Sequence, residues 1–173
     1  MKKIAIDMDG VIANVYSQFI KMHAVAFGKI LTLEETTGKA EGDAFPDLLN
    51  CVNSPGFFRN APVMEDSQRV VERLNERYKI FIVSAAMEFP NSLVEKQAWL
   101  NEHFPFIHWR QMVFCGSKEI IKTDIMIDDH FKNLDHFTGE TFLFTQPHNK
   151  MAEAGQHTRV ETWQEIERLL LPR

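Results

Sequence analysis

The sequence has 173 residues, of which 45% are hydrophobic and 25% are charged. This balance is typical of a globular protein with one domain, or one domain with an insertion, whose core needs no disulfide or metal. The formal net charge of −5 argues against a nucleic-acid polymer as the main partner, because surfaces that bind nucleic acid are basic. A small anionic ligand is still compatible with an acidic protein, since a binding site can be locally positive.

No pattern in the sequence predicts export or membrane insertion. The N-terminal segment reaches Asp7 after three apolar residues, too few for the apolar stretch of a signal peptide. No run approaches the roughly 18 uncharged apolar residues of a membrane span. The two cysteines, Cys51 and Cys115, lack the spacing of metal ligands, and free thiols fit a reducing compartment. We therefore expect a cytoplasmic protein with no membrane partner.

Short apolar segments alternate with helical patterns along the chain. Strands are predicted for residues 4–6, 80–83, 112–114, 125–127 and 141–144. Helices are predicted from residue 15 to a stop at Gly28, and for residues 67–78, 92–104 and 162–170. Capping boxes beginning at Ser92 and Thr162 open the last two helices. Between residues 29 and 62 the periodicity fades, and we expect short helices and loops there.

Strands that alternate with helices predict an α/β fold with a parallel sheet covered on both faces. Residues 80–83 are apolar at every position, as expected for a strand buried on both sides. In such sheets, ligands bind outside the carboxyl ends of the strands. The polar residues that follow the predicted strands are therefore the candidates for chemistry.

The first predicted strand leads into an acidic motif, Asp7-Met8-Asp9-Gly10. At a strand end, the chain can direct one carboxylate and the next backbone carbonyl toward a shared point. A similar motif opens calcium loops of the EF-hand type, but those loops place a Glu at the twelfth position. Counted from Asp7 this position is Gln18, and the preceding segment is strand-like, so the calcium interpretation is poor.

Three further strand ends carry residues suited to phosphate chemistry. Ser84 ends one buried strand and precedes the small Ala85, although a serine there is more often an ordinary turn residue. Lys118 supplies a point charge for phosphate, although a lone lysine on a loop is usually solvated. Asp128 and Asp129 end another strand, and two adjacent acids repel each other unless a cation lies between them.

Together, the strand ends supply two acid pairs, a hydroxyl and a lysine. Magnesium prefers oxygen ligands in octahedral geometry, so two carboxylates and a carbonyl would suit Mg²⁺. The metal and Lys118 would offset the repulsion between a phosphate dianion and an attacking carboxylate. Response-regulator receivers combine the same residue types, but their phosphorylated Asp lies on a later strand than their acid pair. The present sequence lacks that isolated strand Asp.

This ordered set resembles the haloacid-dehalogenase-like phosphohydrolases, and among them the 5′(3′)-deoxyribonucleotidases, also called cytosolic type C 5′-nucleotidases. The likeness spans nearly the whole chain. The matching segments are Asp7-Met8-Asp9-Gly10-Val11-Ile12-Ala13, Pro55-Gly56-Phe57-Phe58, residues 80–84, Glu95-Lys96-Gln97-Ala98-Trp99, residues 118–129, Leu143-Phe144-Thr145, His148-Asn149 and Trp163. The resemblance implies a Rossmann-like core of residues 1–14 and 65–173, with a helical cap of residues 15–64 inserted after the first strand.

The resemblance also implies roles for the acidic residues. Asp7 would be the nucleophile that forms an aspartyl-phosphate intermediate. Asp9 would protonate the leaving alkoxide and then activate water. Mg²⁺ would bind the Asp7 carboxylate, the Asp9 backbone carbonyl and the Asp129 carboxylate, while Asp128 orients Lys118.

The transferred phosphoryl group would be held by Ser84, by backbone amides near Ala85 and by Lys118, acting as positioned electrostatics. Lys96 resembles a further contact on the cap or phosphate side, and a solvated helix face is equally compatible. We expect His130 to be a loop residue near the site. His148 and Asn149 match the family and are expected to organise the loop after the last predicted strand.

The sequence departs from the resembled family in its cap. Family members stack the base on cap aromatics that often include Trp, whereas the three tryptophans here lie outside residues 15–64, and residues 36–40 contain no aromatic. The candidate replacements are Phe57, Phe58, Phe45 and Tyr16. Because Phe57 and Phe58 also fit a packing role, the sequence leaves nucleotide specificity open.

We expect a magnesium-dependent phosphomonoesterase that hydrolyses (deoxy)ribonucleoside 5′(3′)-monophosphates. The alternative in the same fold is a phosphatase or phosphotransferase for another small-molecule phosphate ester. A module that binds metal or nucleotide without turnover belongs to a different class, and its hallmark would be the loss of Asp7 or Asp9. Both residues are present. Exposed apolar cap residues could also serve a homodimer.

Overall fold

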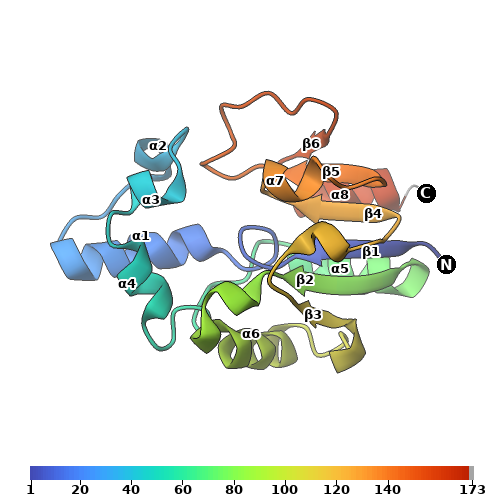
Figure 1. Cartoon of the computed structure of the whole chain (residues 1–173), viewed down its shortest axis with the longest axis horizontal. Helices are drawn as coiled ribbons and strands as arrows, with labels where there is room; N and C mark the ends of the chain where they lie inside the picture. The colour runs from blue at the N-terminus through green and yellow to red at the C-terminus, as the bar shows by residue number, and fades with distance from the viewer. Residues whose placement is uncertain (172–173) are drawn as a thin grey trace.

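The computed structural model describes residues 1–171 and contains a six-stranded parallel sheet (Figure 1). The strands, in sheet order, are β3 (Met112–Phe114), β2 (Lys79–Ser84), β1 (Lys3–Asp7), β4 (Ile125–Asp128), β5 (Glu140–Phe144) and β6 (Thr158–Val160). The predicted α/β fold and its five predicted strands are confirmed. The sequence does not predict the edge strand β6, because Thr158-Arg159-Val160 contains no apolar run.

Helices and short 3-10 turns connect these strands. They are α5 (Ser67–Arg77), η1 (Ala86–Glu88), α6 (Pro90–His103), η2 (Trp109–Gln111), η3 (Lys118–Ile120), α7 (Phe131–Leu134) and α8 (Trp163–Leu170). The predicted helices are found with small shifts at their ends. Within residues 1–171, no helix combines the length and the apolar character needed to cross a bilayer.

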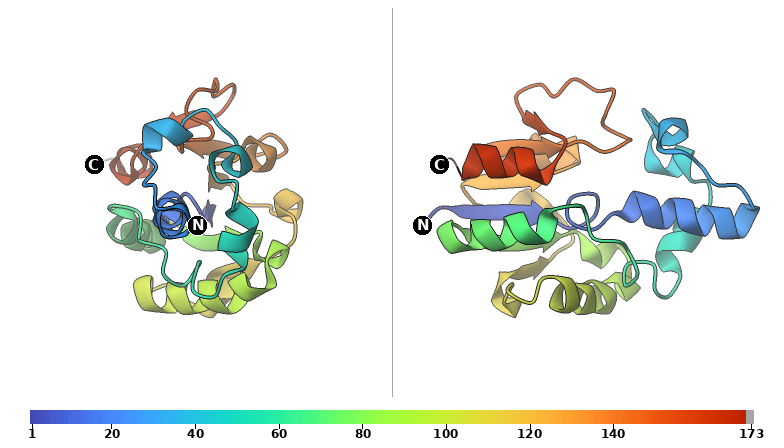
Figure 2. Two further views of the ribbon diagram at one scale, coloured as in Figure 1. Left: turned by 90° about the vertical axis from the view of Figure 1, so that its left-hand side faces the viewer. Right: turned by 180° about the vertical axis from the view of Figure 1, so that it is seen from behind.

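Both faces of the sheet are buried, because successive residues of a strand point to opposite faces. Ile4 and Ile6 of β1 pack into a cluster with apolar residues of α5, α6 and α8, and α5 and α8 lie side by side (Figure 2). Ala5 and Met126 face the other way and pack with Leu134 of α7. The continuous apolar run in β2 correctly indicates this burial on both faces.

The remaining helices lie beyond the carboxyl ends of the strands (Figure 1). They are α1 (Val15–Phe27), α2 (Leu33–Thr36), α3 (Glu41–Ala44) and α4 (Leu48–Asn53). They have an apolar cluster of their own, and α1 ends as predicted at Gly28, whose φ is +67°. We propose that residues 15–64 form a helical cap on a core of residues 1–14 and 65–173, of which 172 and 173 lie outside the described part.

The start of α6 differs from the predicted capping box at Ser92. The helix begins at Pro90, whose fixed φ suits the first turn, and it has no side-chain cap. The Ser92 hydroxyl donates to a backbone carbonyl in η1. The Glu95 carboxylate accepts hydrogen bonds from backbone N–H groups in residues 56–59. Both side chains are committed to tertiary contacts, so the local motif does not form.

Candidate active site

The first acid pair spans the end of β1 and the tight loop that follows this strand. The backbone carbonyl of Met8 accepts hydrogen bonds from the N–H groups of residues 11–13. Gly10 turns this loop with φ +75°, a conformation that favours glycine. A Cβ atom at Gly10 would lie 2.3 Å from Oδ2 of Asp129. Glycine is therefore required for the first acidic loop to approach the second acid pair.

Lys118 joins the two acidic segments at the floor of the site. Its Nζ lies 2.6 Å from Asp7 Oδ1 and 2.6 Å from Asp128 Oδ2, and all three side chains are buried. Burial raises the pKa of Asp7 to about 7, although the ammonium of Lys118 acts in the opposite direction. Burial also disfavours the charged amine of Lys118, but Asp128 and Asp7 outweigh it and raise the pKa of Lys118 above its usual value. Lys118 is therefore a fixed positive charge.

The carboxylate of Asp128 is fully engaged by protein groups. Its Oδ1 accepts from the backbone N–H of His130 and from Asn133 Nδ2, both at 2.9 Å. Its Oδ2 accepts from Lys118. With both oxygens occupied, Asp128 is suited to orienting Lys118, which is the role that the resemblance implies for it.

Asp129 has a different environment although it is the next residue. Its carboxylate oxygen Oδ1 is buried and has no hydrogen-bond partner within residues 1–171. Its backbone carbonyl lies 2.9 Å from His148 Nε2 and accepts from Asn149 Nδ2 at 2.8 Å. Burial raises the pKa of the Asp129 carboxyl well above its ordinary value, and Asp7 adds to this shift. A held backbone and an unpaired buried oxygen are the arrangement expected of a metal ligand.

The acidic residues of the site fit a hard divalent cation. One carboxylate oxygen each from Asp7, Asp128 and Asp129 lies within 4.8 Å of the others, and all three side chains are buried. A single lysine cannot neutralise three carboxylates. Within residues 1–171 the buried Oδ1 of Asp129 has no hydrogen-bond donor, and a bound cation would supply the missing positive partner. Oxygen-only donors of this kind suit Mg²⁺.

Lys96 joins the second acid of the first pair to the end of β2. Its Nζ lies 2.5 Å from Asp9 Oδ2 and 3.0 Å from Ser84 Oγ. It also lies 4.4 Å from the centre of the Phe58 ring. Because the residue is only 2% exposed, the interpretation of Lys96 as part of a solvated helix face is wrong.

The candidate residues line one cavity of about 220 Å³ between the strand ends and the helices α1 and α4. The predicted residues on its wall are Asp7, Asp9, Ser84, Ala85, Lys96, Lys118, Asp129, Phe57 and Phe58. Asp128 lies behind this wall. Phe57 and Phe58 line the cavity and also pack in the apolar cluster of residues 15–58, so their packing role is confirmed, whereas a contact with substrate stays a prediction.

Several cavity residues belong to no recognisable sequence motif. Glu41, Glu88 and Phe89 line the cavity, and Asn133 both lines it and holds Asp128. Glu41 lies in the segment without periodicity, so nothing in the sequence marks it. The only local signal for Asn133 is its position one helical turn beyond the acid pair.

The parallel sheet, with acids at its strand ends, has the fold of the haloacid-dehalogenase-like proteins. A haloacid dehalogenase-like protein of Agrobacterium tumefaciens superposes with a TM-score of 0.63 at 13% identity, over 98% of this chain and 97% of that chain. A hydrolase of the same class from Deinococcus radiodurans superposes with a TM-score of 0.60 at 15% identity, over 98% and 95% of the two chains. At these identities the likeness shows the fold alone.

Sequence relatives narrow the class to one family. A family model described as "5′ nucleotidase, deoxy (Pyrimidine), cytosolic type C protein" matches residues 1–173. The 5′(3′)-deoxyribonucleotidase of Bacillus subtilis is 40% identical over 181 aligned positions, which cover 99% of this chain and 100% of the relative. A protein of the same name from Bacillus phage SPbeta matches equally well. The chain belongs to this 5′-nucleotidase family and is a hydrolase of phosphoric monoesters.

Proposed function

We propose that this protein is a magnesium-dependent phosphatase that hydrolyses (deoxy)ribonucleoside 5′(3′)-monophosphates through an aspartyl-phosphate intermediate. The names of its relatives support the nucleotide substrate. The observation that carries the chemistry is the position of Asp7. Its buried carboxylate contacts Lys118 beside an unpaired Asp129 oxygen, at the floor of the cavity.

In the first half-reaction, Asp7 attacks the phosphorus atom of the substrate. Its Oδ1 is held by Lys118 and by the backbone N–H of Met8, which leaves Oδ2 as the oxygen free to form the new bond. The ester P–O bond breaks, and Asp9 transfers its proton to the departing sugar oxygen. Ser84, the backbone amide of Ala85 and Lys118 stabilise the negative charge on the transferred oxygens.

In the second half-reaction, water attacks the phosphorus atom of the aspartyl phosphate. Asp9 takes the proton from this water, the bond between Asp7 and phosphorus breaks, and inorganic phosphate leaves. Lys96 contacts Asp9 and Ser84 in the substrate-free site. We expect Lys96 to move its contact from Asp9 to the phosphate when substrate enters, so that Asp9 is free to carry the proton.

The metal site would be formed by the carboxylates of Asp7 and Asp129 and the backbone carbonyl of Asp9. When bound, Mg²⁺ supplies positive charge that reduces the repulsion between the phosphate and Asp7. Asp128 does not need to ligate it, because both of its oxygens already accept hydrogen bonds from protein groups.

The size and lining of the cavity are also compatible with a second substrate class, namely another small-molecule phosphate ester. Its volume of about 220 Å³ is below the roughly 300–1,000 Å³ of typical ligand pockets. No tryptophan is among its described lining residues, and its aromatic wall consists of Phe19, Phe57, Phe58 and Phe89. We expect a compact ester to fit this volume more readily than a nucleotide, part of which would extend out of the cavity.

Phosphate release from a panel of substrates tests the function. With Mg²⁺, we expect the highest kcat/KM for deoxyribonucleoside 5′- or 3′-monophosphates, lower values for ribonucleotides, and the lowest for sugar phosphates. Preference for a sugar phosphate would contradict the nucleotide assignment but would be consistent with the proposed aspartyl-phosphate mechanism.

Asp7→Asn is the matched control, because it keeps the side-chain shape and removes the nucleophile. Its activity should fall to background. After acid quenching, mass spectrometry should find one phosphoryl group on Asp9→Asn protein and none on Asp7→Asn. Activity of Asp7→Asn close to that of the parent protein would contradict the assignment of the nucleophile.

A further inference from the structure

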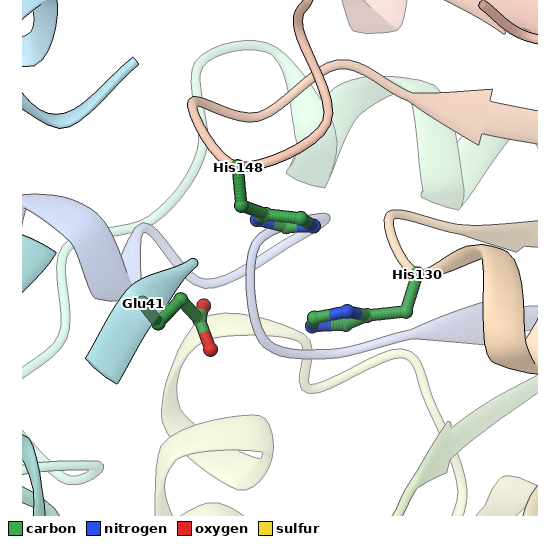
Figure 3. Close-up of side chains that lie close together, drawn as sticks. All are labelled: Glu41, His130 and His148. Atoms are coloured by element: carbon green, nitrogen blue, oxygen red, sulfur yellow. The ribbon is translucent and has the colours of Figure 1, made fainter. Parts of the chain in front are cut away.

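Glu41, His130 and His148 form a second cluster of metal-ligating side chains beside the acidic site (Figure 3). Glu41 is the first residue of α3, His130 follows the acid pair after β4, and His148 lies in the loop after β5. Each side chain offers one ligand atom, and the three atoms lie within 4.8 Å of one another. Three segments far apart in the sequence therefore place two imidazoles and a carboxylate at one point.

The proposed hydrolytic mechanism uses none of these three side chains. Within residues 1–171, the Glu41 carboxylate and the His130 ring accept or donate no hydrogen bond. The rings of His130 and His148 are stacked, with their centres 4.4 Å apart and their planes inclined by 15°. All three residues are partly buried. The Glu41 carboxylate and the His130 ring are therefore not committed to other groups of the described residues and are available to a ligand.

The hydrogen bonds of His148 prepare one of its nitrogens for a ligand. Its Nε2 lies 2.9 Å from the carbonyl oxygen of Asp129, which can only accept, so Nε2 carries the proton. The lone pair is then on Nδ1, which lies 3.1 Å from the Tyr16 hydroxyl. Metal-binding histidines commonly donate their other N–H to a backbone carbonyl in this manner. An incoming cation would replace the Tyr16 hydroxyl at Nδ1.

The donor types select the class of cation. Two imidazole nitrogens and one carboxylate oxygen are a common ligand set for Zn²⁺, with a fourth position open to water. Mg²⁺ prefers oxygen donors and is slow to lose its waters, so it suits the aspartates rather than this cluster. A cavity of about 440 Å³, lined by Glu41, His130 and His148 among others, gives the cluster room for water and a route of entry.

We propose that Glu41, His130 and His148 form a second cation site that binds a transition-metal ion of the zinc class. An ion in this site links α3 to the two core loops. Glu41 and His130 also line the catalytic cavity, so the ion would hold the helical segment against the mouth of that cavity. Zinc binding should therefore hinder the entry of substrate without displacing Mg²⁺.

Calorimetric titration of Zn²⁺ into the intact protein, with Mg²⁺ in large excess, tests the site. We expect one Zn²⁺ per chain, with affinity reduced at least tenfold in Glu41→Gln and in His130→Gln. Neither change removes a hydrogen bond within the described residues, so folding should be preserved. His136→Gln is the matched control, because His136 is exposed and lies outside the cluster, and it should bind Zn²⁺ like the parent protein.

Cobalt gives an independent readout of the ligands. Co²⁺ with nitrogen ligands and low coordination number absorbs visible light more strongly than Co²⁺ surrounded by six oxygens. The parent protein in excess Mg²⁺ should show the strong bands, and Glu41→Gln and His130→Gln should lose them. Absence of Zn²⁺ binding in excess Mg²⁺, or equal binding by both variants and the parent, would overturn the proposal.

Steady-state kinetics then separate the two sites. Zinc at the proposed site raises KM, and additional Mg²⁺ does not relieve the effect. Relief by Mg²⁺ would place the zinc ion among the aspartates and contradict the proposal. Neither the Zn²⁺ titration nor the Co²⁺ spectrum requires turnover. Their results therefore do not depend on whether the proposed nucleotidase activity is found.

Discussion

Asp128 and Asp129 are adjacent in the sequence, yet their carboxylates have opposite environments. Asp128 accepts hydrogen bonds from Lys118, Asn133 and a backbone N–H. Asp129 keeps a buried oxygen without a partner in the described chain. The two residues point to different sides because they lie at a strand end, where successive side chains alternate. Their different partners support Asp129 as the metal ligand and Asp128 as the residue that orients Lys118.

Asparagine substitutions at the two positions should therefore have different consequences. Asp129→Asn should raise the Mg²⁺ concentration needed for half-maximal activity by roughly tenfold or more. Asp128→Asn should change that concentration less and should mainly lower kcat, because Lys118 loses one of its two carboxylates. Magnesium titrations of phosphate release measure both effects. A larger metal effect in Asp128→Asn would reverse the assignment.

At the scale of elements, α6 connects the segment that follows α4 to the loop after β1. The Glu95 carboxylate accepts from the backbone N–H groups of Gly56 at 2.6 Å and of Phe58 at 3.1 Å. The next residue, Lys96, contacts Asp9 and Ser84. One turn later, the indole of Trp99 donates to the carbonyl of Ala61 at 2.8 Å. This helix therefore fixes the position of the chain that returns from α4 to the core.

Glu95→Gln should weaken this connection. The amide keeps the size of the side chain but has only one accepting oxygen, so backbone donors at residues 56–59 lose their partner. We expect a loss of roughly 1–3 kcal/mol in the free energy of unfolding. We also expect a higher KM, because Phe58 lines the cavity. Chemical denaturation and steady-state kinetics measure the two effects.

Glu76→Gln provides the control on α5, because Glu76 is exposed and should change the stability by less than about 0.5 kcal/mol. If Glu95→Gln were as stable as this control, with an unchanged KM, the turn at residues 56–59 would not depend on α6.

At the scale of the whole molecule, the buried acids should make the free energy of unfolding depend on pH and on bound metal. The folded protein raises the pKa of Asp7 to about 7 and also raises that of Asp129, both chiefly by burial. The folded state thus binds protons more tightly than the unfolded chain. The stability that this provides is complete below pH 4 and is lost as the pH rises through about 7. Metal-free protein should become less stable over this range.

Magnesium should reverse this loss, because it binds the folded state alone. At a free concentration of about 100 times Kd, the expected stabilisation is about 2.7 kcal/mol. The effect should be larger at pH 8 than at pH 5, since protonated carboxyls must first release their protons. Thermal unfolding with EDTA or with Mg²⁺ measures it, and Asp129→Asn should respond weakly. Equal stabilisation at both pH values would contradict the role of the buried acids.

The sequence by itself determined the α/β class, five strands and the candidate acids, Ser84 and Lys118. Apolar runs identify buried strands, and parallel strands bring the residues after them to one edge. The weak points were local motifs with a competing tertiary partner. The Ser92 capping box failed because Glu95 binds a distant turn, and β6 was missed because an edge strand of three residues needs no apolar run.

Only the tertiary structure decided which distant groups each charged side chain contacts. Three findings depend on segments that lie far apart in the chain. Lys96 is buried against Asp9, and both carboxylate oxygens of Asp128 accept hydrogen bonds. The side chains of Glu41, His130 and His148 lie close together. Local patterns of polarity record whether a residue faces the core, but they contain no information on which distant group it meets there. The fold could therefore be predicted from the periodicity of apolar residues, whereas the partners of each charged side chain could be identified only in the folded structure.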